Sequence, residues 1–409
     1  MIPVSKALDI IARETRPLGS ERVALADAVG RVLREDIIAD TDLPPFDRSQ
    51  MDGFALVASD TIKAPVTLKV VGESAAGKGL HKIMNRGEAV RIMTGAPVPT
   101  GADSVQKVEL TSEISALLRS GGANGTDQFV EITASTEKGR SIVRKGSEVR
   151  KGTTVFKAGE IVTENMVATL ASFGYAKVTA GKRPRVAILG TGSEVVEINK
   201  KPGRDQIRNS NSVMLDVFCR RAGATTRIQP MIKDEIAVLK TGIKMAARNS
   251  DIVVITGGVS VGKYDYTKTA LSDLEADIFF EKVRLRPGKP AVFARLGKTL
   301  IFGLPGNPVS AAVTFHLFVR KAILAMQGAE TTDLKKGTAI AASDAKAARE
   351  RDTYLPAKLS TDKVGHLIAD PLKWQGSSDF IGFSQADSLI FVPRGGQLSK
   401  GQVAEIVFL

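Results

Sequence analysis

The chain has 409 residues, of which 43% are hydrophobic and 25% are charged, a composition typical of a soluble globular protein. At roughly 150 residues per domain, this length predicts two to four domains. Lysine and arginine exceed aspartate and glutamate by 57 to 44, and the net charge of +13 favours anionic partners. With 5% aromatic residues and no recognisable nucleic-acid module, we expect a small phosphorylated or oxyanionic ligand and no nucleic acid.

The N-terminal segment predicts an amphipathic helix and not a signal peptide. Val4, Ala7, Leu8 and Ile11 recur at helical spacing, and no basic stretch precedes an uninterrupted apolar core. No apolar run in the sequence approaches the roughly 20 residues that cross a bilayer. We therefore expect a cytoplasmic protein with no membrane partner.

Three regions differ in their pattern along the chain. Residues 1 to about 180 mix helices with Gly-, Thr- and Val-rich segments typical of β structure. Residues 182 to 328 alternate strands and helices, and residues 333 to 409 contain short alternating runs separated by turn residues. The last region therefore predicts a small all-β domain.

The middle region predicts a mostly parallel α/β sheet. Strands are expected at 185–189, 252–256 and 299–302, where runs of Val and Ile without alternation indicate strands covered on both faces. A helix within residues 209–223 should stop at Gly223, which is placed as its C′ residue.

Cysteine and histidine usage disfavours structural zinc and a Cys/His protease. Cys219 is the single cysteine and lies in a helical pattern, so we predict that it fills the core. His81, His316 and His366 are far apart and lack metal-ligand spacing. His316 lies within an apolar helical run, where a satisfied core or helix-face histidine is expected.

Each of the three expected strands is followed by a glycine-rich loop that carries a hydroxyl side chain. The loops read GTGSEV (190–195), GGVSVGKYDYT (257–267) and GLPGNPVSAA (303–312). Ligands of α/β sheets bind beyond the carboxyl ends of the strands, where such loops can present backbone N–H groups to an anion. None of the loops is a dinucleotide or P-loop fingerprint, which disfavours a Rossmann dehydrogenase and a P-loop NTPase.

The third loop contains an unusual number of helix and strand breakers. Asn307 and Pro308 occupy favoured N-cap and N1 positions of the helix that follows, and Gly303 and Gly306 permit a tight turn off the strand. We predict that this loop forms a stiff wall of an anion-binding pocket.

Charged residues accompany these loops. Glu194 and Asp265 suggest a divalent cation that bridges carboxylates and phosphates, whereas Asp234 serves equally well as a helix N-cap. The basic run VRLRPGKP places Arg286 and Lys289 beside a Pro-Gly turn, either as a clamp for an oxyanion or as a solvated turn.

Two further segments are dense in loop-forming residues. DLPPFDRSQMDGFA, residues 42–55, predicts a structured loop that packs on another element, because Phe46, Met51 and Phe54 accompany its prolines. IMTGAPVPTGAD, residues 92–103, is similarly dense.

Six motifs in this order, DLPPFDRSQMDGFA, IMTGAPVPTGAD, GTGSEV, GGVSVGKYDYT, LRPGKP and GLPGNPVSA, resemble those of the molybdopterin molybdenumtransferase family, MoeA in bacteria and the E domain of gephyrin in animals. The resemblance covers the whole chain. It implies a multidomain α/β protein with an elongated domain I (1–48 and 143–178), an inserted β-rich domain II (49–142), a MogA/MoaB-like pterin-binding α/β domain III (179–328) and a C-terminal β-barrel domain IV (329–409).

The resemblance also implies a reaction and partners. Adenylylated molybdopterin and molybdate give molybdenum cofactor and AMP, with Mg²⁺, in a homodimer whose active site is shared between subunits. A MogA-like adenylyltransferase and molybdoenzyme chaperones are the implied protein partners. The pterin's dithiolene sulfurs hold the metal, so a chain with one cysteine fits.

The motif positions imply residue roles. The implied catalytic residues are Asp52, Thr94, Glu194, Asp234 and Asp265. The implied substrate-binding residues are Gly257, Gly258, Ser260, Gly262, Arg286, Lys289, Pro305 and Ser310. The implied metal ligands are Glu194, Asp265 and Glu148.

The sequence departs from the family pattern at several motif positions. Arg48, Gln50 and Phe54 replace residues of FDNSAMDGYA, and Ser193 replaces the aspartate of TGDE. Glu148 stands where an aspartate often follows GE or GD, and Arg286 replaces the first lysine of KPGKP.

Three alternatives stay open beside the transferase. A MogA-type molybdopterin adenylyltransferase needs only the middle domain, so the long first half and the β-rich tail count against it. A scaffold or clustering protein is a second alternative, against which the absence of a linker and a second enzymatic domain argues. A homologue that binds cofactor without turnover is a third, although the carboxylates are intact.

Overall fold

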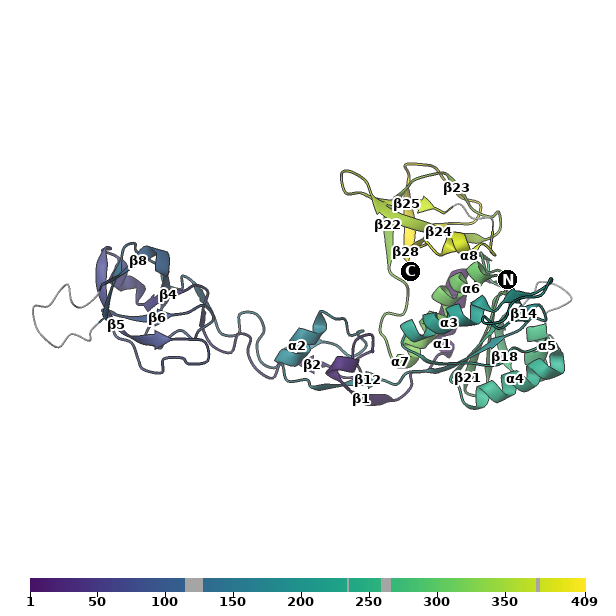
Figure 1. The fold of residues 1–409 in the computed structure, drawn as a ribbon, viewed down its shortest axis with the longest axis horizontal. Helices are drawn as coiled ribbons and strands as arrows, with labels where there is room; N and C mark the ends of the chain where they lie inside the picture. Colours follow the sequence, from purple (N-terminus) through teal and green to yellow (C-terminus); the bar gives the residue numbers. More distant parts are fainter. Residues whose placement is uncertain (115–127, 234, 259–265, 373–375) are drawn as a thin grey trace, which may run out of the picture. The chain divides into compact units, whose positions relative to one another are not determined.

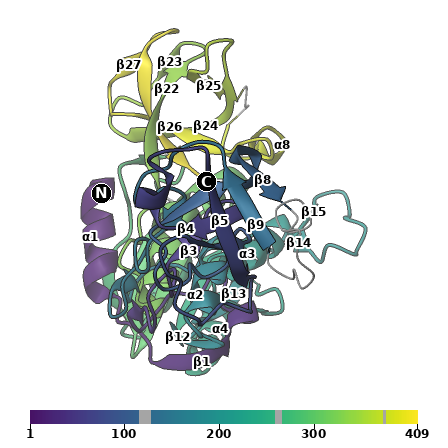
Figure 2. The same ribbon diagram turned by 90° about the vertical axis from the view of Figure 1, so that its left-hand side faces the viewer.

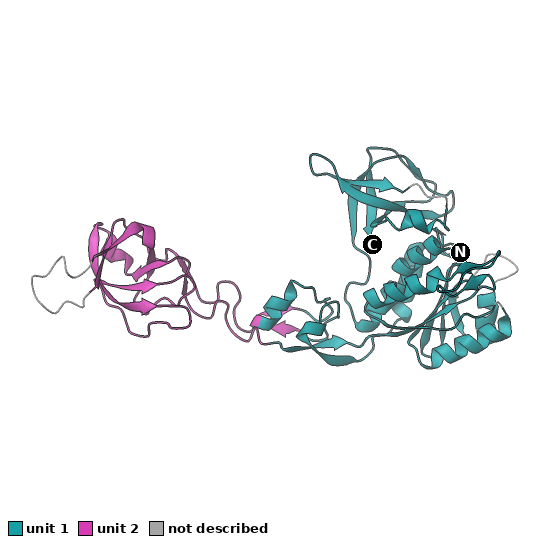
Figure 3. Ribbon diagram, in the orientation of Figure 1, with its two compact units in different colours: residues 1–35, 157–171, 175–409 teal, residues 36–156, 172–174 magenta. Residues whose placement is uncertain are grey.

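We describe a computed structural model of the chain. The described residues are 1–114, 128–233, 235–258, 266–372 and 376–409. They form two compact units, coloured separately in Figure 3. The larger unit holds residues 1–35, 157–171 and 175–409, and the smaller unit holds residues 36–156 and 172–174. The finer division into four domains, with its boundaries, stays a prediction.

A six-stranded sheet forms the centre of the larger unit. Its order is β16 (Thr225–Ile228), β13 (Arg185–Gly190), β17 (Ile252–Thr256), β21 (Thr299–Leu304), β20 (Val292–Leu296) and β18 (Asp277–Phe280). Strands β16, β13, β17 and β21 pair in parallel, and β20 is antiparallel to both of its neighbours. Only β20 therefore runs against the others, which confirms the predicted mostly parallel sheet.

Both faces of this sheet are buried, as its unbroken apolar strands predict. Along β13, Val186 and Ile188 join one core cluster, whereas Ala187 and Leu189 join a second cluster on the opposite face. Figure 1 shows helices on both sides of the sheet. The first face is covered by α1 (Val4–Glu14), α3 (Ser210–Arg221), α6 (Pro308–Thr314), the π-helical turn Phe315–Val319 and α7 (Arg320–Gln327), and the second by α4 (Ile236–Arg248) and α5 (Tyr266–Asp273).

The C-terminal part of the larger unit forms a closed five-stranded barrel. The ring is β24 (Asp352–Thr361), β25 (Leu367–Pro371), β22 (Lys336–Ala341), β28 (Val403–Phe408) and β26 (Ser388–Val392), and it closes because β26 pairs with β24. The short strand β19 (Leu285–Arg286) pairs with β24 from outside the ring. Barrel strands lie together at the top of Figure 2, with β23 (Ala345–Lys346) and β27 (Gln397–Leu398) beside them. The predicted all-β tail is thus confirmed as a barrel.

Smaller elements complete the larger unit. A ribbon pairs β1 (Ser20–Ala24) with β12 (Lys177–Gly181), and the short strands β14 (Val195–Val196) and β15 (Ile207–Arg208) pair in parallel. The helix α2 (Met166–Ser172) ends where the chain passes briefly to the other unit, and α8 (Phe380–Phe383) lies in the barrel region.

The smaller unit is built on its own six-stranded sheet. Its order is β7 (Ser104–Lys107), β4 (Gly53–Leu56), β6 (Glu88–Ile92), β5 (Val66–Ser74), β9 (Gln128–Ile132) and β8 (Thr111–Ile114). Alternate residues of β4 enter separate apolar clusters, with Ala55 in one and Phe54 and Leu56 in the other. Two short pairs, β2 (Ile37–Ile38) with β11 (Thr154–Phe156) and β3 (Arg48–Ser49) with β10 (Ile142–Val143), complete the unit.

The helix-capping positions predicted from the sequence are found in the larger unit, with one exception in the hydrogen bonding. Gly223 follows the C-cap residue of α3 with a left-handed φ of 93°, as predicted. Asn307 and Pro308 occupy the N-cap and N1 positions of α6, but the Asn307 side chain makes no capping hydrogen bond. Its Nδ2 instead donates to Ser377 Oγ at 2.7 Å, so this loop is fastened to the barrel region.

The continuous helix Pro308–Gln327 is long and apolar enough to cross a membrane by length and composition, among the residues described. In its most apolar window, however, 83% of the residues are buried inside the protein. Its hydrophobicity is therefore that of a core helix. Cys219 is also buried in this core, where burial raises the pKa of its thiol, which confirms the predicted packing role.

Candidate functional site

The three glycine-rich loops meet at one edge of the larger unit's sheet. They follow β13, β17 and β21, which are adjacent and parallel, so their carboxyl ends lie at the same edge. Gly257 adopts a φ of 90°, and a Cβ placed there would lie 2.4 Å from the Thr191 carbonyl oxygen. A Cβ at Gly306 would lie 3.6 Å from the Gly257 Cα. The predicted meeting of the loops is confirmed at backbone contact distance, which only glycine permits at position 257.

Asn211 joins these loops through its side-chain amide. Its Nδ2 donates to Thr256 Oγ1 at 3.0 Å and to the Gly306 carbonyl oxygen at 2.7 Å. The Thr256 hydroxyl in turn donates to the Pro305 carbonyl oxygen at 3.4 Å. One side chain at the start of α3 thus fixes the end of β17 against the loop after β21.

Several buried polar atoms at this edge have no hydrogen-bond partner among the described residues. They are Thr191 Oγ1, Asn211 Oδ1, Ser212 Oγ and Thr267 Oγ1. Leaving a buried hydroxyl unpaired costs about 1–3 kcal/mol, so such a group normally has a partner. Four of them together at a sheet edge indicate a site that offers hydrogen bonds to a polar ligand.

Sequence reasoning missed Asn211 and Ser212 as site residues. Both lie in the first turn of α3, within the segment RNSNS, where the pattern gives only the helix N-cap, which is Asn209. The signal that could have found them is the repetition of polar residues at the start of a helix on the ligand-binding edge of an α/β sheet.

Glu194 is exposed in the first loop, and its carboxylate folds back over Gly192. It makes no ion pair with any described residue. Nowhere among the described residues do three His, Cys, Asp or Glu side chains form a cluster that could hold a metal ion. The other predicted residues Asp234, Ser260, Gly262 and Asp265 lie outside the described residues, and α4 has Glu235 as its N-cap residue.

Pro305 and Ser310 are both buried at the start of the segment that follows β21, and their role as a pocket wall stays a prediction. Pro305 is buried directly after β21, and Ser310 is buried in the first turn of α6. The φ values of Gly257 and Gly258, 90° and 61°, turn the second loop sharply away from β17.

Arg286 and Lys289 flank a turn that packs against α6. Arg286 ends β19 beside Thr353 of the barrel, with an exposed side chain that has no ion-pair partner among the described residues. A Cβ at Gly288 would lie 2.5 Å from Thr314 Cγ2, so the turn is held tightly on the helix. The segment is therefore a fixed turn that presents an unpaired guanidinium.

In the smaller unit, Asp52 and Thr94 form a direct pair. Asp52 Oδ1 accepts hydrogen bonds from the Thr94 backbone N–H at 2.6 Å and from Thr94 Oγ1 at 3.1 Å. The antiparallel register of β4 and β6 pairs Gly53 with Ile92 and so brings the two residues together. A Cβ at Gly53 would lie 2.0 Å from the Gln106 carbonyl oxygen, which explains the glycine of the MDG motif. Both paired side chains are exposed to solvent.

Glu148 is not a free carboxylate, because Arg48 Nη2 lies 3.0 Å from its Oε1. This pair belongs to a set of contacts that fasten residues 42–48 to residues 144–151. Asp47 accepts from the Lys145 backbone N–H at 2.8 Å and from Arg144 Nη1 at 2.6 Å. The predicted structured loop at 42–55 is thus confirmed. Partial burial opposes ionisation of Asp47, but these two hydrogen bonds outweigh it and lower the pKa of the carboxyl group.

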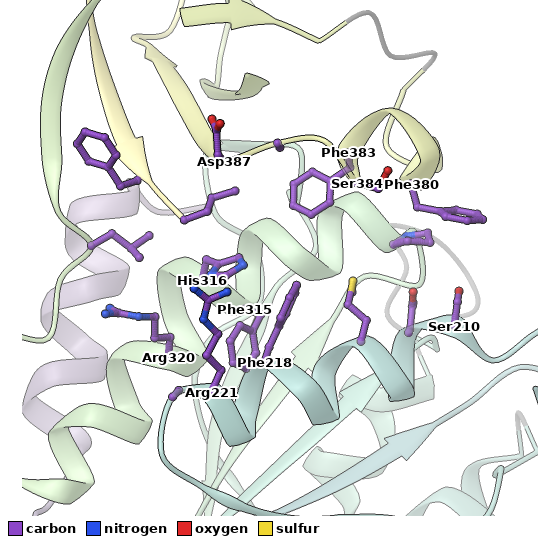
Figure 4. Close-up of a pocket in the computed structure, with 18 of the residues that line it drawn as sticks. Ser210, Phe218, Arg221, Phe315, His316, Arg320, Phe380, Phe383, Ser384 and Asp387 are labelled. Carbon is purple, nitrogen blue, oxygen red and sulfur yellow. The ribbon is translucent and has the colours of Figure 1, made fainter. Parts of the chain in front are cut away.

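The prediction for His316 was wrong in one respect. The residue lies in the core helix, but its Nδ1 is buried without a hydrogen-bond partner. Burial, Arg320 and Arg221 together lower the pKa of His316 to about 4, so the imidazole is neutral near pH 7. It borders a cavity of about 790 Å³, shown in Figure 4.

Comparisons with known proteins agree with the fold. The family model of the MoeA N-terminal region (domain I and II) matches residues 2–174. A "Probable molybdopterin binding domain" matches residues 187–325, and the MoeA C-terminal region (domain IV) matches residues 338–409. The second match contains all three glycine-rich loops.

Relatives and solved structures match over the whole chain. A molybdopterin molybdenumtransferase of Bacillus subtilis is 34% identical over 100% of this chain and 94% of its own length, and one of Staphylococcus aureus is 33% identical over 99% and 95%. A crystal structure of the molybdopterin biosynthesis MoeA protein from Pyrococcus horikoshii superposes with a TM-score of 0.83 at 28% identity, over 100% of both chains.

The fold and these full-length matches therefore define a multidomain transferase of molybdenum cofactor biosynthesis. Within that class, the chain belongs to the MoeA family of molybdopterin molybdenumtransferases.

Proposed function

We propose that this chain inserts molybdate into adenylylated molybdopterin and releases AMP. The observation that carries the proposal is the edge site, where three glycine-rich loops meet and four buried polar atoms lack partners among the described residues. Hydroxyl and amide groups of this kind bind a pterin and its phosphate without adding negative charge. The family relationship supplies the class of reaction.

The larger unit provides the groups that hold both substrates. We assign the pterin phosphate to the loop that begins at Gly257 and Gly258 and continues through Ser260 and Gly262. Pro305 and Ser310 shape the wall, which Asn211 fixes in place. Molybdate is a tetrahedral oxyanion, for which the Lys289 ammonium and the Arg286 guanidinium, which has no ion-pair partner in the described part of the chain, are suitable partners.

The chemistry requires neutralisation of charge on the phosphoanhydride that breaks when AMP leaves. Mg²⁺ commonly binds through one or two carboxylates together with substrate phosphates. The Glu194 carboxylate, which has no ion-pair partner among the described residues, fits that pattern, and we assign Asp265 as a second ligand. When bound there, the ion would stabilise developing charge on the phosphate oxygens. To act as a further ligand of the ion, Glu148 would have to give up its ion pair with Arg48.

The smaller unit contributes the Asp52–Thr94 pair. We propose that this pair completes the active site of a second subunit in a homodimer, and that the dimer acts in the cytoplasm. An exposed carboxylate that is oriented by two hydrogen bonds is positioned to accept a proton or to orient a substrate. The four-domain division implied by the sequence belongs to this proposal.

Turnover is tested by incubating the protein with adenylylated molybdopterin, molybdate and Mg²⁺ and measuring AMP. The proposal expects AMP release that depends on molybdate. An adenylyltransferase would instead consume ATP with unmodified molybdopterin, and a scaffold or non-catalytic binder would do neither. AMP release at the same rate without molybdate would contradict the proposed insertion.

The shared site is tested by mixing two inactive variants, Asp52→Asn and Asn211→Asp. If the site is formed between subunits, a mixed dimer contains one site with both native residues. We expect mixing after brief denaturation and refolding to restore about a quarter of the specific activity. Activity that stays at the level of the separate variants would overturn the shared site.

A further inference from the structure

Asp52 lies at one end of the smaller unit's sheet, where three neighbouring strands begin or end. Strands β4 and β6 lie side by side in Figure 1, and the first residue of β4, Gly53, lies opposite the last residues of both β6 and β7. One residue further out, this register places Met93 and Val108 on either side of Asp52. The Val108 backbone N–H donates to the Asp52 carbonyl oxygen at 3.0 Å, which agrees with that placement.

Apolar side chains are exposed around the Asp52 carboxylate. Met51, Met93 and Val108 are 47%, 45% and 42% exposed. Ile92, which directly precedes Met93, is 1% exposed. Strand β6 thus buries its apolar residues up to the point where it reaches Asp52. Apolar side chains that are exposed together, and not singly, mark a surface that another molecule covers.

The free oxygen of the Asp52 carboxylate favours a substrate over a protein segment as the covering molecule. Oδ1 accepts both hydrogen bonds from Thr94, whereas Oδ2 has no hydrogen-bond partner among the described residues. An apolar protein surface that covered these side chains would leave an ionised oxygen buried without a partner, which is costly. A substrate that reacts at Asp52 covers the apolar side chains and also supplies that partner.

We propose that Met51, Met93 and Val108 form an apolar collar that packs on the ring system of adenylylated molybdopterin and so places that substrate at Asp52. The proposal rests on the function proposed above, in which this unit completes the edge site of a second subunit. Both methionines carry flexible, polarizable thioethers, which make favourable contacts with aromatic rings. Contacts with rings that do not react strengthen substrate binding, whereas Asp52 contributes to turnover.

Oxidation of methionine to its sulfoxide by hydrogen peroxide tests whether the substrate covers the collar. Met245 of α4 is 64% exposed in the larger unit and is the internal reference, so peroxide consumed by the substrate cancels in the ratio of rates. Adenylylated molybdopterin is added without molybdate, and sulfoxide is quantified in peptides by mass spectrometry. We expect oxidation of Met51 and Met93 to slow about fivefold relative to Met245.

The footprint separates the substrate from a second subunit. If Met51 and Met93 are already protected relative to Met245 without substrate, and substrate adds nothing, a protein surface covers the collar and the proposal is overturned. Absence of protection at a substrate concentration that saturates binding also overturns it. Because the footprint measures no AMP, it decides the role of the collar even if the proposed turnover fails.

The variant Met93→Ser tests the collar during turnover. Loss of its apolar contact should raise the KM for adenylylated molybdopterin about tenfold and leave kcat within about twofold. Met93→Leu keeps an apolar side chain of similar volume and should hold KM within about threefold of wild type. Ile62→Ser removes a 73% exposed side chain elsewhere in the same unit and should leave KM unchanged. A lower kcat with an unchanged KM in Met93→Ser would overturn the role of Met93 in substrate binding.

Discussion

The side-chain amide of Asn211 donates a 2.7 Å hydrogen bond to the main-chain carbonyl oxygen of Gly306, 95 residues further along the chain. The same amide donates to Thr256 Oγ1 at 3.0 Å. A single side chain therefore fixes the end of β17 against the loop that follows β21. The geometry of the edge site depends on this residue as much as on the glycines.

Replacement of Asn211 by Asp should disable the edge site. The substitution keeps the shape but removes both donors, and the new carboxylate repels the Gly306 carbonyl oxygen. We expect AMP release to fall at least about 100-fold, since loss of two hydrogen bonds and gain of a repulsion amount to roughly 3 kcal/mol. Asn199→Asp, at an exposed position of the same unit, is the control and should retain activity. Wild-type turnover in Asn211→Asp would refute this role.

Replacement of Asp52 by Asn should remove activity while the fold survives. Asp52 is exposed, and an amide oxygen still accepts from the Thr94 N–H, so we expect unfolding free energies within about 1 kcal/mol of wild type. AMP release should fall by two orders of magnitude or more, since the charge that acts on the substrate is lost. Thr94→Ser keeps the hydroxyl and should retain most activity, whereas Thr94→Val should not. Equal activity in the serine and valine variants would show that this hydroxyl has no role.

Comparison of Gly257→Ala with Gly297→Ala distinguishes the cost of a steric clash with the neighbouring backbone from the cost of a positive φ alone. Both glycines have positive φ, 90° and 60°, but a Cβ meets the Thr191 carbonyl oxygen only at Gly257, while Gly297 faces open space. We expect Gly297→Ala to cost about 1 kcal/mol in unfolding free energy. Gly257→Ala should cost about 2 kcal/mol more and abolish AMP release. Chemical denaturation measures both, and equal costs would contradict the contact.

The stability of the smaller unit at acid pH should depend on the carboxyl groups of Asp42 and Asp47. A hydrogen bond from the Lys151 backbone N–H lowers the pKa of Asp42; partial desolvation opposes this effect and the charge of Lys145 adds to it. For Asp47, against the opposing effect of partial burial, the Lys145 backbone N–H and Arg144 lower the pKa. A carboxyl group whose pKa is lower in the folded state stabilises the fold above its ordinary pKa of 3.8, and that stabilisation is lost as pH falls through the lower folded value.

The backbone amide protons of Lys145 and Lys151 report these titrations directly by NMR. We expect their chemical shifts to change with midpoints below pH 3.8. In Asp47→Asn, the titration should vanish at Lys145 and persist at Lys151. Midpoints at or above 3.8 would contradict the assigned hydrogen bonds.

The sequence predicted much of the larger unit because its signals are local. Strand β17 occupies the expected residues 252–256, since an unbroken run of Ile and Val has few other uses in an α/β protein. Strand β21 extends two residues beyond the expected 299–302, because Gly303 and Leu304 still pair with β17. The meeting of the three loops followed from one general rule about parallel sheets.

Contacts between distant residues could not be predicted in the same way. Asn211 looks like an ordinary polar residue at a helix start until the order β13-β17-β21 places Gly306 within its reach. The Asp52–Thr94 contact depends on the register of β4 and β6, which packing of the whole sheet determines. Among the described residues His316 Nδ1 has no hydrogen-bond partner, which depends on how α3 and the barrel region surround the ring and not on the apolar pattern of its own helix.

The most direct test of the central claim compares molybdenum transfer with AMP release in a single turnover. Protein, adenylylated molybdopterin, Mg²⁺ and labelled molybdate are mixed, and AMP and pterin-bound molybdenum are quantified together. Molybdate transfer coupled to anhydride cleavage predicts one molybdenum bound to pterin for each AMP, with neither formed in Asn211→Asp. Release of AMP without pterin-bound molybdenum would contradict it.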